Sequence, residues 1–258
     1  AQKLQYMAVW LYDKGNIQKA LENLRNAIEI CPQFAEAYSI KGIILSETCG
    51  LDAAVDSYKE ALKIKPDYTE VHYNMGKVLQ EKGELDAAID SYKQAIKIKP
   101  DYADAYLNMG VALKDKGELD AAIDSYKQAI KIKPDYAEAY NNMGNALKDK
   151  GDLDAAIDSY KQAIKIKPDY AEAYNNMGAA LKGVKFSKPI SELPEIIVNL
   201  LNKNTAVRPS DIAPAAISLI KLDKVFQSVL SKYFSGELDH TLEQSVSKLS
   251  RIPLLLKL

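Results

Sequence analysis

The residues best suited to binding chemistry in this sequence are four asparagines that recur every 34 residues. A carboxamide donates and accepts hydrogen bonds, so a row of them can hold the backbone of an extended peptide whatever its side chains. The alternative is a purely structural role for these asparagines. Tyr6 and Ile40 interrupt the row, which we therefore expect only further along the chain, at Asn74, Asn108, Asn142 and Asn176.

Acidic residues flank this row on both sides. If the asparagines lie on helices, spacings of four and seven residues place these carboxylates on the same helical stripe. A groove edged in this way favours basic or neutral peptides. The alternative for the first row is helix capping, in Asp-x-x-Glu boxes such as Asp169 to Glu172. The row before the asparagines is Glu70, Asp104, Glu138 and Glu172, and the row after them is Glu81, Asp115 and Asp149.

Further positions vary between near-identical segments that start at Thr69, Ala103 and Ala137. The second halves of these segments are the same, and the differences gather in the first halves. We interpret this variation as tuning of a binding surface, the alternative being drift without consequence. The variable residues that we add to the predicted partner-binding set are Tyr73, Lys77, Asn141 and Asn145.

Composition argues against other chemistry. With 2 Cys and 2 His the chain cannot form a disulfide scaffold or a zinc site built from those ligands. The net charge of -1 gives no reason to expect nucleic acid, and no run of about 18 apolar residues could span a membrane. We expect no catalytic residue, metal or cofactor, and a cytoplasmic protein. Since the chain starts at Ala1, we read it as a piece of a longer protein.

Two helices per 34-residue copy must position these side chains. In the copy starting at Ala137, apolar residues follow helical spacing, Gly151 suits the end of the first helix, and Pro168 stops the second. The same pattern accounts for most of the 16 tyrosines as core residues. We expect an all-α chain with copies at 1–34, 35–68, 69–102, 103–136 and 137–170, and the first helix of a sixth up to 183.

These copies resemble tetratricopeptide repeats (TPR). The residues that carry the resemblance are Tyr140, Met143, Gly144, Leu147, Ala156, Tyr160, Ala163 and Pro168. The resemblance implies a right-handed superhelical solenoid whose first helices line a concave groove for a protein or peptide partner. The asparagine row is also similar to the one in the repeat domain of O-linked N-acetylglucosamine transferase.

A different helical sequence follows a linker at 184–190. Apolar spacing predicts three helices within 191–258, near 193–201, 210–235 and 242–249. They either cap the open end of the solenoid, as terminal repeats need, or begin a downstream domain that is cut short. This tail resembles the region after the repeats in bacterial TPR proteins that carry a methyltransferase domain.

The sequence thus favours a non-catalytic scaffold that binds an extended peptide in its groove. One alternative is the substrate-recruiting arm of a larger enzyme, of methyltransferase or glycosyltransferase type, with its catalytic domain beyond Leu258. Another is a structural module that self-associates through the ends of the solenoid.

Overall fold

Every regular element in the described part of the chain is a helix, which confirms the all-α prediction. The computed structural model describes residues 1–48, 50–182, 184, 197 and 209–222. The chain divides into two compact parts, Ala1–Pro134 and Asp135–Leu258. We call them the N-terminal part and the C-terminal part.

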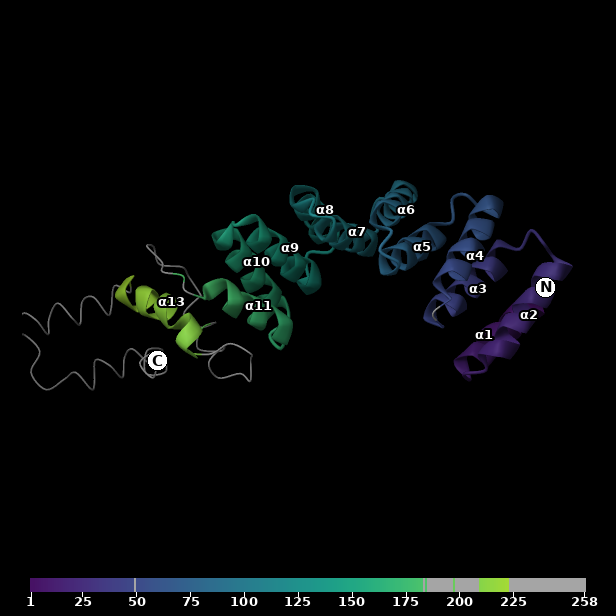
Figure 1. The fold of residues 1–258 in the computed structure, drawn as a ribbon, viewed down its shortest axis with the longest axis horizontal. Coiled ribbons are helices and arrows are strands. Elements are labelled where there is room, and N and C mark those ends of the chain that lie inside the picture. Colours follow the sequence, from purple (N-terminus) through teal and green to yellow (C-terminus); the bar gives the residue numbers. More distant parts are fainter. Residues whose placement is uncertain (49, 183, 185–196, 198–208, 223–258) are drawn as a thin grey trace, which may run out of the picture. The chain divides into compact units, whose positions relative to one another are not determined.

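The N-terminal part consists of four helix pairs, one for each of the first four repeats (Figure 1). Within a pair the two helices pack along their length, and the second helix of one pair also contacts the first helix of the next. The helices are α1 (Gln2–Asp13), α2 (Ile17–Ile30), α3 (Ala35–Glu47), α4 (Leu51–Ile64), α5 (Thr69–Glu81), α6 (Leu85–Ile98), α7 (Ala103–Asp115) and α8 (Leu119–Ile132).

Among its described residues, the C-terminal part holds the fifth repeat, the first helix of the sixth, and helix α13 of the tail (Figure 1). The tail helix overlaps the range predicted for the second helix of that region and starts one residue before it. Of the predicted helix near 193–201 the structure describes Ile197, which is helical and buried, and the predicted helix near 242–249 lies outside the described residues. The helices are α9 (Ala137–Lys150), α10 (Leu153–Ile166), α11 (Ala171–Leu181) and α13 (Pro209–Leu222).

One predicted helix end is confirmed by the structure, and another is wrong. Gly151 ends α9 in the left-handed conformation, with φ of 92°, as expected for a glycine at that place. The predicted capping box at Asp169 is wrong, because α11 has Tyr170 as its N-cap and no side-chain cap bond. The helix starts one residue later than the box requires, so Glu172 is free to bond elsewhere.

A tyrosine ring facing a glycine forms the centre of repeats two to five. Tyr160 of α10 is fully buried, and a Cβ atom on Gly144 of α9 would lie 2.5 Å from its ring. Only a residue without a side chain lets the ring lie this close to the helix. Repeat one solves the same packing problem with Ala8 and Leu24, both fully buried, which pair a larger first residue with a smaller second one.

The buried tyrosine hydroxyls differ in their partners. Tyr160 donates to Oδ1 of Asn145 at 2.8 Å, and Tyr92 donates to Oε1 of Gln80 at 3.0 Å. The hydroxyl of Tyr126 has no hydrogen-bond partner among the described residues. Val111 stands in repeat four where Asn145 stands in repeat five, and it offers no polar atom.

Removing these hydroxyls should therefore have opposite effects on stability. We expect Tyr126→Phe to raise the free energy of unfolding by about 1 kcal/mol, because it removes a buried polar group that lacks a partner. We expect Tyr160→Phe to lower it by about 1 kcal/mol, because it breaks a hydrogen bond. Urea unfolding followed by circular dichroism measures both. Equal shifts of the same sign would contradict the difference in hydrogen bonding.

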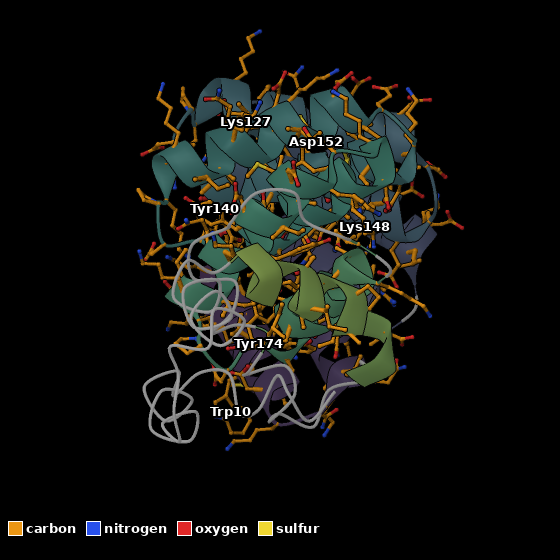
Figure 2. All side chains as sticks on the ribbon, turned by 90° about the vertical axis from the view of Figure 1, so that its left-hand side faces the viewer. Trp10, Lys127, Tyr140, Lys148, Asp152 and Tyr174 are labelled. Atoms are coloured by element: carbon orange, nitrogen blue, oxygen red, sulfur yellow. The ribbon has the colours of Figure 1, made fainter. Side chains whose placement is uncertain are left out.

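The tail helix α13 packs against α11. Ile212, Ala215 and Ala216 of α13 are fully buried in one core cluster with Met177 and Leu181 of α11. Tyr174 of α11 belongs to the same cluster and lies beside α13 in Figure 2. In the earlier repeats the second helix of the repeat covers the apolar face of the first helix, as α13 does here for α11. That the whole tail caps the solenoid remains a prediction.

Candidate functional site

A pocket on the first helices of the N-terminal part brings two predicted partner-binding residues together. It has a volume of about 570 Å³, and Asn74 and Lys77 of α5 line it. Its other lining residues are Ile43, Ser46 and Glu47 of α3, Tyr58 of α4, and Val78 and Glu81 of α5. Amide, hydroxyl, ammonium and carboxylate groups therefore line one hollow together with the apolar side chains of Ile43 and Val78, which suits the side chain and backbone of a peptide.

Charge in this pocket is mixed, with carboxylates in excess. Glu47 and Glu81 are exposed carboxylates, and Lys77 is an exposed cation. Burial, together with the charge of Glu47, raises the pKa of Tyr58 to about 12 against a lowering by its hydrogen bond with Ser46. Tyr58 therefore stays neutral at physiological pH and acts as a hydrogen-bonding wall of the pocket.

Part of this pocket could have been found in the sequence. Glu47 occupies the thirteenth place of its repeat, as Glu81 does in the next one. Extending the predicted acidic row back by one repeat would have identified it. Sequence reasoning missed Ile43, Ser46 and Tyr58 because it began the binding row at Asn74.

A second cluster in the N-terminal part joins the third and fourth repeats. Nδ2 of Asn108 donates to the hydroxyl of Tyr73 at 2.8 Å, and the Tyr73 ring lies 4.9 Å from that of Tyr102. Burial raises the pKa of Tyr102 to about 12, with Tyr73, Asp104 and Glu70 adding to the shift. The structure thus brings the predicted residues Tyr73, Asn108, Asp104 and Glu70 into one neighbourhood.

A matching cluster in the C-terminal part joins the fifth repeat to α11. Nδ2 of Asn176 donates to Oδ1 of Asn141 at 3.0 Å, and Nδ2 of Asn141 donates to Oε1 of Glu172 at 3.0 Å. Burial raises the pKa of Tyr170 to about 12, and the carboxylates of Glu172 and Glu138 add to the shift. The polar groups here form a chain that runs from a partly exposed asparagine through a buried one to an exposed carboxylate.

Asn141 and Asn145, which were predicted to touch a partner, form hydrogen bonds within the protein. Asn141 is fully buried, and Asn145, which is partly buried, accepts the hydrogen bond of Tyr160. Asn142 and Asn176 remain partly exposed on the first helices, and Glu138 is exposed. At this position of the repeat Leu107 and Asn141 are buried, and Tyr73 is partly exposed.

A separate apolar surface lies on α1, the first helix of the chain. Trp10 is 54% exposed and Tyr6 is 64% exposed. Together with Lys3 and Met7 they line a shallow hollow of about 540 Å³. At the place of Trp10 the third and fourth repeats bury Val78 and Ala112. Association through the ends of the solenoid remains a prediction.

Two other properties concern the described residues alone. None of their helices combines the length and apolar character needed to cross a bilayer. They also contain no group of three His, Cys, Asp or Glu residues placed to hold a metal ion.

Comparison with known proteins identifies the repeats. A family model described as TPR repeat matches residues 11–47, 51–83, 76–117, 112–151 and 144–184. The sequence has no match among curated proteins.

Solved structures share the fold. MamA is 28% identical, with a TM-score of 0.61 over 64% of this chain and 96% of its own. YrrB, described as a TPR protein with an unusual peptide-binding site, is 24% identical, with a TM-score of 0.59 over 66% of this chain and 88% of its own. PilF of Pseudomonas aeruginosa is 15% identical, with a TM-score of 0.62 over 90% of this chain and 96% of its own.

Proposed function

Because the chain belongs to the TPR repeat family, we propose that it binds an extended segment of a partner protein on its first helices. The observation that carries this proposal is the pocket around Asn74 and Lys77, whose lining combines hydrogen-bonding side chains with apolar ones. The repeat fold is typical of protein-interaction scaffolds, and YrrB, which shares it, has a peptide-binding site. The proposed role of the pocket is binding, without a chemical reaction.

The charges of the pocket indicate the kind of segment. Two exposed carboxylates, Glu47 and Glu81, stand against one exposed ammonium group, Lys77. A bound segment with a lysine or arginine would find acceptors there, whereas an acidic segment would meet like charge. We therefore propose a basic or neutral partner segment, whose affinity falls as salt rises because these charges are exposed to solvent.

Replacing Asn74 by alanine should weaken peptide binding. Peptides selected on an array with the wild-type protein, and then measured in solution by fluorescence anisotropy, supply the ligand. We expect roughly a five-fold to ten-fold loss of affinity for Asn74→Ala, the amount that corresponds to one or two hydrogen bonds. Changing Asn74, Asn108, Asn142 and Asn176 together should abolish measurable binding.

The matched control lies on the second helix of the same repeat. Gln94 of α6 is an exposed carboxamide outside the pocket, and Gln94→Ala should leave affinity unchanged. Glu81→Gln adds a charge test, because it should weaken binding of a lysine-containing peptide and spare that of an uncharged one. Unchanged affinity in the fourfold alanine variant would overturn the proposal that these asparagines bind the partner.

A further inference from the structure

A buried asparagine is hydrogen-bonded to a partly exposed one in the C-terminal part. Asn141 of α9 is fully buried, and it bonds with both Glu172 and Asn176 of α11. Its neighbour Asn176 is partly exposed and belongs to the predicted binding row. The hydrogen bonds therefore link a residue hidden from any partner to one that can meet it.

The carboxylate of Glu172 determines which group donates and which accepts in these hydrogen bonds. An ionised carboxylate only accepts hydrogen bonds, so Asn141 must turn its NH₂ group toward Glu172. The carbonyl oxygen of Asn141 is then the atom left for Asn176, and it too only accepts. Asn176 therefore donates an N–H of its side chain to Asn141, at 3.0 Å. Its own carbonyl oxygen lies on the other side of the amide group, away from this bond.

We propose that Asn141 is a positioning residue which holds Asn176 with its carbonyl oxygen available to a partner, so that this site selects peptide segments rich in N–H donors. This inference rests on the proposed peptide-binding function and narrows it. Glu172 adds a second acceptor, since its carboxylate is exposed beside the same pair. A lysine ammonium group, with three N–H donors, can satisfy both acceptors and a backbone N–H can satisfy one of them, whereas a carboxylate satisfies neither.

The other repeats contain natural variants of the positioning residue. In repeat three Tyr73 takes this place, and its hydroxyl bonds with Asn108 at 2.8 Å. In repeat four Leu107 takes it, buried and without a polar group. Tyrosine therefore restores a hydrogen bond at this position, and leucine fills the space without one. Both are tolerated in this fold.

The first test needs no ligand. Nuclear magnetic resonance of the full chain resolves the side-chain NH₂ groups, and in the wild type those of Asn141 and Asn176 should exchange slowly with water. Asn141→Leu should remove the protection of Asn176, and Asn141→Tyr should keep it. Glu172→Gln should reduce it, because an amide can donate or accept and no longer fixes the direction. Unchanged protection of Asn176 in Asn141→Leu would overturn the positioning role.

The second test measures selectivity with two defined probes, a short alanine–lysine peptide and the matching alanine–glutamate peptide. We expect the wild type to prefer the lysine peptide, Asn141→Leu to bind it about five-fold more weakly, and Asn141→Tyr to retain it. Equal binding of the two peptides would overturn the selectivity, even if the exchange result stands. If Asn74→Ala weakens array-selected peptides while Asn141→Leu changes neither readout, the inference fails and the proposed function survives.

Discussion

Replacing Gly144 with alanine should lower the free energy of unfolding by about 1–3 kcal/mol. A Cβ atom there would lie 2.5 Å from the ring of Tyr160, closer than van der Waals contact allows. Tyr160 is fully buried, so its ring can move away only by displacing the groups packed around it. The sign is informative, because glycine to alanine in a helix interior ordinarily stabilises by about 0.5–1 kcal/mol.

A second substitution should rescue the first. Repeat one pairs Ala8 with Leu24 at the places of Gly144 and Tyr160, and buries both. The double variant Gly144→Ala, Tyr160→Leu reproduces that pair in repeat five. We expect it to be more stable than the sum of the single effects predicts, with a coupling energy of about 1 kcal/mol or more.

Urea unfolding followed by circular dichroism measures all three variants, with the exposed Gln162→Ala of α10 as a control that should change stability by less than about 0.5 kcal/mol. Additive single effects would show that the glycine and the tyrosine do not constrain each other. A stabilised Gly144→Ala would show that the helix has room to adjust.

Alkaline pH should unfold the repeats cooperatively above about pH 10, where tyrosine ordinarily ionises. Burial raises the pKa of Tyr58 to about 12, and it raises the pKa values of Tyr92, Tyr126 and Tyr160 as well. The unfolded chain loses these protons first, so above about pH 10 it binds fewer protons than the folded chain. The free energy of unfolding is therefore constant below that pH and falls as pH rises through the folded values.

Tyrosinate absorbance and helical circular dichroism, recorded during one titration, test this expectation. The part of the tyrosinate absorbance that comes from the buried rings should change together with the helical signal, because these rings ionise only when the repeats open. Loss of ion pairs should contribute little to this transition. Hydrogen bonds with Asp52 and Glu84 raise the pKa of Lys82, so this lysine keeps its charge over the same pH range. Tyr58→Phe should shift the transition to higher pH. Complete tyrosine ionisation with intact helices would contradict the linkage.

The sequence predicted the repeats well because every copy repeats the same local pattern. Gly151 at a helix end and Pro168 after the next helix are local features, and each acts within a few residues. The prediction of a capping box at Asp169 was wrong for an equally local reason. The helix starts one residue later than predicted, and Glu172 bonds with Asn141 instead of capping the helix.

The site was harder to predict than the fold. The period correctly placed Asn74 and Lys77 on one surface, but it could not tell that Asn141 is buried while Asn142 beside it is partly exposed. That difference depends on how the next repeat packs, which is a contact between residues about 35 places apart. Whether an asparagine can meet a partner or is buried within the protein depends on the packing of the next repeat, and the spacing in the sequence does not reveal it.

The position of the single tryptophan gives the protein a built-in optical probe. Trp10 lies 54% exposed on α1, whereas Tyr58, Tyr92, Tyr126 and Tyr160 are buried in the later repeats. Indole emission moves to shorter wavelength when water is excluded, so a blue shift reports that something covers the first helix. A peptide held at Asn74 leaves that emission unchanged. One unlabelled sample can thus distinguish contact at the end of the chain from contact along its first helices.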